Sequence, residues 1–397
     1  MDARERACRI VALLIALGGG VPGGAAAQSG FSMTPSVSAA EVYDDNIFAS
    51  PSRPQPDRIG RLSPAIEMGY DSAPWTLAGR YSQDAETYAE HPDLDTNRAR
   101  QHAALDWRYR PTRVLTVSAG ADYAATQTPS ELNPVTGLNL GRAPAERLSV
   151  GPAVEYRFDP VSVATASYTF IGDRLAGGVA GDTRTVELRV DRAITRRDSA
   201  TVDYLYRRFD FDGGDITSAH VLLFGGTHAF TSRTRVALLA GPRWSQASND
   251  VEASASLQQT IERGTLALEY GRSQSTVIGQ AGVVSTDAIG ASAVRAFGTA
   301  LEIRAGARAA RSARGDGEVD AYSYRVAASY RISSLLALTG SYDAVRQRGT
   351  LDVPSDTQIV HHVLAFGVVV GAPARAELSP GRARWRTTEA PGEDELP

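Results

Sequence analysis

Hydrophobic and polar residues alternate one by one along most of the chain after Gln28. The segment 147–158 shows the pattern, with Leu148 and Val154 on one face and Arg147 and Glu155 on the other. A period of two residues, with one apolar and one polar face, indicates a β-strand that lies between two different environments.

The alternation predicts about 18 strands, each of the length that crosses a bilayer when the strand is tilted. They are expected over 31–43, 58–71, 75–87, 98–110, 113–126, 146–158, 161–172, 184–195, 199–211, 217–230, 234–246, 250–262, 264–275, 285–297, 299–311, 320–332, 335–347 and 358–370.

The connections between these segments alternate between short and long. The tight turns are 71–74, 110–112, 159–160, 196–199, 231–233 and 333–334, and the longer loops include 44–57, 88–97, 127–145, 172–183 and 347–357. The link 247–249 is the one short connection expected on the long-loop side. Short turns at one end and long loops at the other are typical of outer-membrane barrels, in which an even strand number places both termini in the periplasm.

The predicted fold is therefore all-β: a transmembrane, antiparallel, up-and-down outer-membrane β-barrel of 16–18 strands over residues 28–370. Closure is expected because an open sheet in lipid would leave edge N–H and C=O groups unpaired. Aromatic residues near the strand ends are expected to form interfacial girdles against the outer-membrane lipid; they are Tyr70, Trp75, Trp107, Tyr109, Tyr123, Tyr156, Phe158, Trp244, Tyr270, Tyr330 and Tyr342.

Residues 1–27 resemble a cleaved secretory signal peptide. Arg4, Arg6 and Arg9 precede an apolar run over 10–17, and alanines occupy 25–27. This run is too short for a membrane span, and no later stretch is apolar enough for a transmembrane helix. Residues 371–397 are polar and proline-rich, which predicts a disordered periplasmic tail.

The charge balance narrows the function classes. The formal net charge of −4 argues against nucleic acid as a partner. The single cysteine, Cys8, lies within the predicted signal peptide, so disulfides and thiolate metal sites are not expected in the mature barrel.

The polar faces carry ionisable residues, which lipid forbids on the outside of the barrel. The candidate pore-lining residues are Arg80, Arg98, Arg100, His102, Arg108, Arg157, Arg189, Arg207, Arg243, Arg304, Arg308, Arg325, Arg331, Glu67, Glu155, Glu187 and Glu269. These residues form either a ladder of ion pairs in a wet interior or a path of unpaired arginines for an anionic solute. Strand 98–110 is the richest in arginine, and loop 127–145 is the best candidate for a plug by its length.

The segment 43–48, Tyr-Asp-Asp-Asn-Ile-Phe, ends the first predicted strand. Its two carboxylates and one amide fit either calcium binding at the rim or, more often, the capping of a turn.

We find no motif for catalysis, a cofactor or a metal. Six histidines are scattered along the chain, and the neighbours His361 and His362 point to opposite faces of a strand, so they do not chelate one metal together. A Ser–His–acid hydrolase remains a minor alternative without a local motif.

The first strand ending in YDDNIF, followed by a strand with Leu62, Pro64, Ile66 and Tyr70, resembles the β-barrel porin type 2 family of Gram-negative bacteria. The resemblance implies a channel associated with exopolysaccharide export, with a polysaccharide substrate, a polysaccharide export protein as partner, and insertion by the barrel-assembly machinery. It implies no catalytic residue. A general or solute-selective diffusion porin is the alternative.

Overall fold

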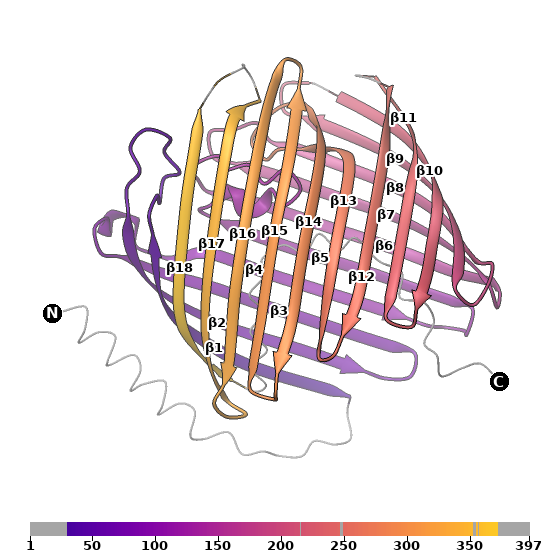
Figure 1. Ribbon diagram of the computed structural model, residues 1–397, viewed down its shortest axis with the longest axis horizontal. Coiled ribbons are helices and arrows are strands. Elements are labelled where there is room, and N and C mark those ends of the chain that lie inside the picture. The colour runs from indigo at the N-terminus through magenta and orange to yellow at the C-terminus, as the bar shows by residue number, and fades with distance from the viewer. Residues whose placement is uncertain (1–29, 215, 247–248, 352–354, 356, 372–397) are drawn as a thin grey trace.

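The computed structural model describes residues 30–371 except 215, 247–248, 352–354 and 356, and it shows a closed wall of 18 antiparallel strands (Figure 1). The strands are β1 (Phe31–Asp44), β2 (Asp57–Asp71), β3 (Trp75–Tyr88), β4 (Thr96–Tyr109), β5 (Leu115–Thr126), β6 (Ala145–Asp159), β7 (Ser162–Leu175), β8 (Gly181–Ala193), β9 (Asp198–Phe211), β10 (Ile216–Thr231), β11 (Thr234–Ser245), β12 (Asn249–Ile261), β13 (Gly264–Thr276), β14 (Val283–Phe297), β15 (Leu301–Arg314), β16 (Gly317–Arg331), β17 (Leu336–Thr350) and β18 (Gln358–Gly371). Two short 3-10 helices, η1 (Pro92–Leu94) and η2 (Pro129–Leu132), lie in connections.

The wall closes because each strand pairs with the next and β1 also pairs with β18. The closing ladder runs from the pair Ser36–Gly371 to the pair Asp44–Val363. We call this junction of the first and last strands the seam. Closure gives each described strand two neighbours, which satisfies the backbone groups that lipid would leave without partners. The prediction of a closed, antiparallel, up-and-down β-barrel is confirmed.

All predicted strands are present, and their ends differ from the expected ones by at most three residues. The largest change in a connection occurs between β15 and β16. The ladder continues to the pair Arg314–Gly317, so only Gly315 and Asp316 form the turn, with Gly315 at a φ of 55°. The expectation that 247–249 is the one short link on the long-loop side is therefore wrong.

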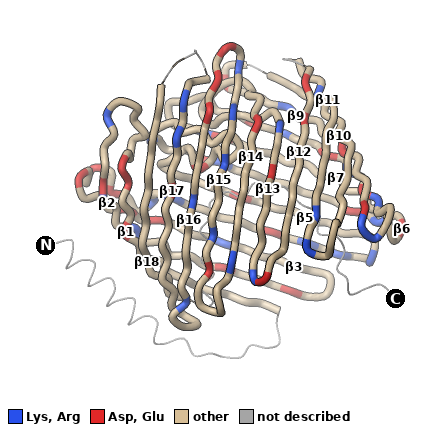
Figure 2. The backbone as a smooth tube through the Cα atoms, viewed as in Figure 1, with Lys and Arg blue, Asp and Glu red and all other residues tan. Residues whose placement is uncertain are grey.

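The two faces of the wall differ in polarity as the alternation predicts. Leu268 and Val326 are exposed on the outer face, whereas their neighbours Glu269 and Arg325 belong to the inner set of positions. Charged positions of both signs are distributed along the strands, many of them near the strand ends (Figure 2). An apolar outer face and a polar inner face are the arrangement that hydrocarbon outside and water inside require.

The predicted girdle residues lie on the outer face, as their pairing register shows. At the short-turn end, the ring of Trp75 stacks on Tyr109 with 4.3 Å between centroids and lies 5.5 Å from Trp107. Aromatic rings with one polar edge prefer the membrane–water interface, and this cluster marks where the short-turn interface is expected.

In the part of the chain that the structure describes, no helix is long and apolar enough to cross a membrane. The predicted signal peptide (1–27) and the predicted tail (371–397) lie outside the described residues, except that Gly371 ends β18.

Candidate functional site

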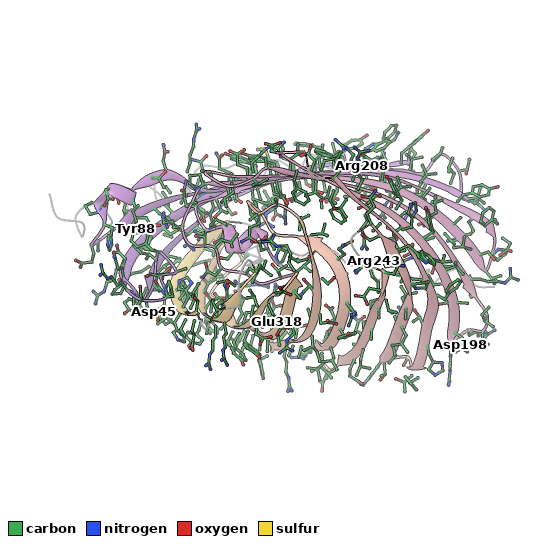
Figure 3. All side chains as sticks on the ribbon, turned by 90° about the horizontal axis from the view of Figure 1, so that it is seen from above. Asp45, Tyr88, Asp198, Arg208, Arg243 and Glu318 are labelled. Atoms are coloured by element: carbon green, nitrogen blue, oxygen red, sulfur yellow. The ribbon has the colours of Figure 1, made fainter. Side chains whose placement is uncertain are left out.

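All candidate pore-lining residues except Arg98 occupy strand positions that alternate with the exposed apolar ones, so they face the interior of the barrel. They are Glu67 on β2, Arg80 on β3, Arg100, His102 and Arg108 on β4, Glu155 and Arg157 on β6, Glu187 and Arg189 on β8, Arg207 on β9, Arg243 on β11, Glu269 on β13, Arg304 and Arg308 on β15, and Arg325 and Arg331 on β16. Figure 3 shows the barrel from above.

Arg98 departs from this pattern because it lies in a bulge. The β3–β4 register jumps from the pair Asp84–Arg100 to the pair Glu86–Thr96. Arg98 is exposed while Ala99 is buried, so the simple alternation that predicted an inward Arg98 does not hold here.

Arg100 stands at the centre of a network of ion pairs on the inner face. Its guanidinium lies 2.5 Å from Glu86 on β3 and 2.6 Å from Glu131 in η2, and Arg61 on β2 also reaches Glu86 at 2.8 Å. The arginine excess predicted for strand 98–110 is therefore partly neutralised by carboxylates from other segments. This network supports the ion-pair reading of the inner face at Arg100.

Glu131 is the member of this network that belongs to a loop. Burial by itself raises the pKa of the Glu131 carboxyl. The positive charge of Arg100 and the hydrogen bonds from Arg100 and the Thr126 hydroxyl lower this pKa by a larger amount. The pKa of Glu131 thus lies below its ordinary value, and the carboxylate stays charged while it holds the loop to β4.

The loop 127–144, which we call the crossing loop, folds into the barrel. Near its start, Arg147 of β6 donates a hydrogen bond to the carbonyl of Leu132. Further along, Arg308 of β15 donates to the carbonyl of Val135 at 2.9 Å, and the amide of Asn139 donates to Gln347 of β17 at 2.7 Å. Strands β15 and β17 lie across the barrel from β6, so the loop spans the interior, where η2 is visible behind the front strands in Figure 1.

An apolar cluster fixes the far end of the crossing loop. Leu138 is 1% exposed and packs with Val277, Val284, Val319 and Leu351. These partners come from β14, from β16 and from two other connections on the long-loop side. Burying a leucine side chain contributes about 1.5–3 kcal/mol, so the crossing loop is docked as a small core. The loop that its length marked as the best plug candidate, 127–145, is thus anchored inside the barrel at both of its ends.

The crossing loop also meets two other connections. The amide of Ile278 donates to the Asn133 side chain at 3.1 Å, and Val179 forms an isolated bridge with Gly279. The connections 127–144, 176–180 and 277–282 therefore touch one another inside the rim. Any solute that passes the barrel in this state has to move around them.

A second group of charges fills the curved wall from β9 to β12. The Arg243 side chain, labelled in Figure 3, is completely buried. It lies 3.5 Å from Glu252 and 3.4 Å from Asp250, while Arg207 lies 2.7 Å from Glu252. Removing one partner from such a buried group leaves an uncompensated charge, so these residues contribute to the shape of the wall as well as to the lining.

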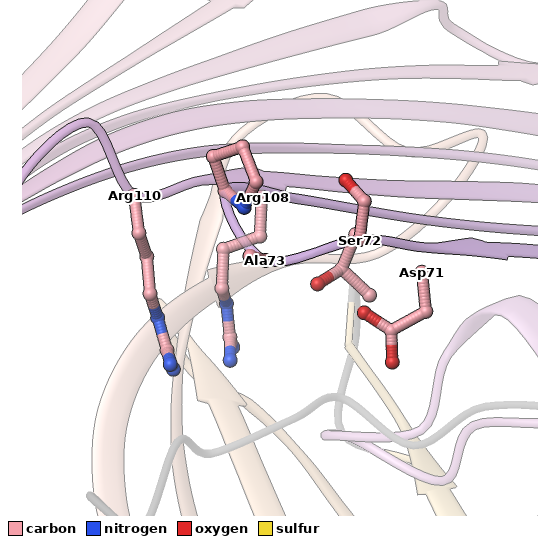
Figure 4. Close-up of a pocket in the computed structure, with 7 residues that line it drawn as sticks. Asp71, Ser72, Ala73, Arg108 and Arg110 are labelled. Atoms are coloured by element: carbon pink, nitrogen blue, oxygen red, sulfur yellow. The ribbon is translucent and has the colours of Figure 1, made fainter. Parts of the chain in front are cut away.

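A pocket of about 540 Å³ opens at the short-turn end of the barrel. Arg108 and Arg110 extend side by side over the turn that contains Ser72 and Ala73, and Asp71 lies beside them (Figure 4). Two cations and one anion give this mouth of the barrel a locally positive lining.

The motif at 43–48 fastens the long-loop end of the seam. The Asp44 carboxylate accepts a hydrogen bond from the Asn46 amide at 2.8 Å, which is the expected turn-capping role. The Asn46 side chain donates to the carbonyls of Ser50 and Val360 at 3.0 and 3.2 Å, so this amide is fully used. The side chain that lies beside the carboxylates of Asp44 and Asp45 is therefore not Asn46 but His361 of β18.

The histidines hold structural partners. His91, His102 and His228 pair with Asp57, Asp122 and Asp198 at 2.8, 2.7 and 2.6 Å. His361 bonds Asp44 on the inner face, whereas His362 bonds the exposed Tyr342 on the outer face. The prediction that these two neighbours point to opposite faces is confirmed, and the hydrolase alternative gains no support from these pairs.

No family model and no curated protein matches the chain. The resemblance to the β-barrel porin type 2 family therefore stays a prediction.

Two solved structures of Pseudomonas aeruginosa proteins show a distant similarity to this chain. OpdL is 13% identical with a TM-score of 0.47, and the match covers 86% of this chain and 98% of OpdL. OccK2 (OpdF), solved in complex with glucuronate, is 10% identical with a TM-score of 0.46, over 86% of this chain and 98% of OccK2.

Proposed function

We propose that this protein is a solute-selective diffusion porin of the outer membrane, whose passage is narrowed by the crossing loop. The observation that carries the proposal is the attachment of one loop to both sides of the interior, through Arg100 and Arg147 on one side and Arg308 and Gln347 on the other. The apolar outer face and polar inner face supply the remaining requirements of a channel.

The crossing loop favours small solutes over a polymer. A barrel of this strand number encloses space for an aqueous channel. Here Leu138, Thr136 and Asn139 of the loop are buried within that space. A polysaccharide chain could pass only if the crossing loop undocked from the apolar cluster around Leu138. A small hydrophilic solute needs only the gaps around the docked loop.

The charged side chains of the interior are arranged so that a passing solute would make only weak contacts with them. Glu67 and Arg80 stand opposite each other in the β2–β3 ladder, and Arg325 of β16 pairs with Asp343 of β17. Arginines that already have carboxylate partners bind a passing solute weakly, and conduction requires release as much as binding.

Export of exopolysaccharide stays a prediction from the resemblance, together with its polysaccharide export protein and its insertion by the barrel-assembly machinery. The contacts of the described residues do not favour it over the diffusion porin, and the crossing loop is an obstacle to it.

The test is reconstitution of the purified barrel into planar bilayers and liposomes. We expect discrete conductance steps, and entry of monosaccharides but not of long oligosaccharides in swelling assays. Replacing residues 133–141 by a short Gly–Ser linker is expected to raise the single-channel conductance and the size limit. A matched replacement in loop 89–95, which lies outside the crossing loop, is expected to change neither.

Two results would contradict the proposal. One is a wild-type barrel that passes long polysaccharide as readily as monosaccharide. The other is a wild-type barrel and a loop-replaced barrel that are both folded and both fail to conduct.

A further inference from the structure

Three side chains with metal-ligating atoms gather at the long-loop end of the seam. They are Asp44, the last residue of β1, Asp45, which follows it, and His361 of β18. One ligand atom from each residue lies within 4.8 Å of the others, and all three side chains are half-buried. We call this group the seam triad.

Backbone groups of the seam orient the triad. His361 Nε2 lies 2.7 Å from Asp44 Oδ1, and the backbone N–H of Asn46 donates a hydrogen bond to the same oxygen at 2.8 Å. The His362 amide donates to Asp45 Oδ1 at 2.7 Å. The three ligand groups are therefore brought together by the folded barrel from positions at both ends of the chain, before any ion is present.

The mixture of donors selects the kind of ion. Calcium and magnesium prefer sites made only of oxygen, whereas an imidazole with carboxylates suits zinc and other first-row transition metals. A calcium loop would use the side-chain amide of Asn46, but the nitrogen of this side chain already donates hydrogen bonds to two backbone carbonyls. The triad supplies one nitrogen and carboxylate oxygens, and a water molecule can complete a tetrahedral set.

We propose that the seam triad binds one divalent transition-metal ion, zinc or a close chemical equivalent, and that the ion staples β1 to β18. His361 binds through Nε2, so the proton that this nitrogen shares with Asp44 is released to solvent when the ion enters. The last pair of the closing ladder is Asp44–Val363. The ion thus joins the first and last strands where their ladder ends.

The neighbouring charges leave the triad negative enough for a cation. Asp343 of β17 pairs with Val363 of β18 in the ladder, but its carboxylate is bonded by Arg325. Asp44 and Asp45 therefore supply two carboxylates to the triad, with His361 as their close partner.

The proposal is tested with zinc chloride alone, added to the metal-stripped full barrel in detergent, without a histidine tag. We expect one ion per barrel by equilibrium dialysis or calorimetry, and a melting temperature that rises with zinc concentration, because an ion that binds only the folded state stabilises it. Cobalt(II) is expected to give a visible absorption band from the same site.

The variant His361→Asn is expected to weaken zinc binding by at least roughly 10–100-fold. That is the loss of metal affinity seen when a residue that only hydrogen-bonds a ligand is changed, and His361 is itself a proposed ligand. The matched control is His362→Asn, because His362 is the adjacent residue on the outer face and bonds Tyr342; its zinc affinity is expected to equal that of the wild type. The variant Asp45→Asn keeps an oxygen that accepts from the His362 amide but loses the charge, so it tests the site even if His361→Asn does not fold.

The proposal is overturned if the wild-type barrel binds no stoichiometric zinc, or if His362→Asn weakens binding as much as His361→Asn does. It is also overturned if folded Asp45→Asn keeps the full zinc affinity and the cobalt band. These outcomes are independent of conductance, so they do not bear on the proposed porin function.

Discussion

The carboxylate of Glu131 accepts a hydrogen bond from the guanidinium Nε of Arg100 at 2.7 Å, and this contact ties a loop that crosses the barrel to the inner face of β4. Arg100 also binds Glu86, so the strand keeps its own ion pair whether or not the loop is docked. The Glu131–Arg100 contact is therefore a fastening whose loss should free the loop without opening the wall.

The substitution Glu131→Gln is expected to undock the crossing loop more often. Hydrogen bonds to charged groups contribute about 1.5–3 kcal/mol, which shifts the ratio of docked to undocked loop by roughly one to two powers of ten. Single-channel recording should show more time at the higher conductance level. The control is Glu67→Gln, on the inner face of β2 opposite Arg80; equal behaviour of the two variants would contradict the role of Glu131.

Low pH is expected to weaken the same contact between Glu131 and Arg100. The pKa of Glu131 is lower in the folded barrel than its ordinary value. Its contribution to docking is therefore complete above the ordinary glutamate pKa of about 4.3 and is lost as the pH falls through the folded value. Conductance is expected to rise below about pH 4.3 in the wild type. The Glu131→Gln variant should lack this acid step, and a step of equal size in both proteins would exclude Glu131 as its source.

The substitution Leu138→Ala should loosen the far end of the crossing loop. Truncating a buried leucine costs about 2–5 kcal/mol, depending on how far the site collapses. Limited proteolysis of the barrel in detergent is expected to cut the loop of this variant faster than that of the wild type. Leu338→Ala is the control, because Leu338 is exposed on the outer face; loop cleavage at the wild-type rate in Leu138→Ala would show that the apolar cluster does not hold the loop.

The outer face should reject charge. Leu268 is the fifth of the 13 residues of β13 and is exposed on the outer face. Arginine on the lipid face costs up to about 2–4 kcal/mol near the bilayer midplane and less toward the interfaces. Refolding of Leu268→Arg into vesicles, followed by urea titration, should show this loss of stability. Glu269→Gln changes the adjacent inner residue and should have a much smaller effect. A stable Leu268→Arg barrel would contradict the position of this strand in lipid.

The sequence predicted the wall well because strand alternation is a local property. A residue such as Leu268 differs from Glu269 in polarity, and this contrast repeats along each strand whatever the rest of the chain does. The same reasoning failed at Arg98, because the bulge between Asp84 and Glu86 on one strand and Arg100 and Thr96 on the other has no local polarity signal.

The functional contacts were harder to predict because they join distant segments. Loop length alone marked 127–145 as a plug, but nothing local indicated that Asn139 would bond Gln347 or that Leu138 would meet Val319. Likewise, the sequence grouped Asp44 and Asp45 with Asn46, whereas the third side chain of the group is His361, 317 positions from Asp44. Only the closure of the barrel brings them together.

The attachment of Asn46 and Asp44 to β18 also bears on the order of biogenesis. Their partners, Val360 and His361, are among the last residues of the wall to be synthesised. The side-chain contacts of this amino-terminal turn are therefore complete only when β18 lies beside β1. A barrel that lacks β18 would therefore also lack the partners that hold the turn after β1 in place.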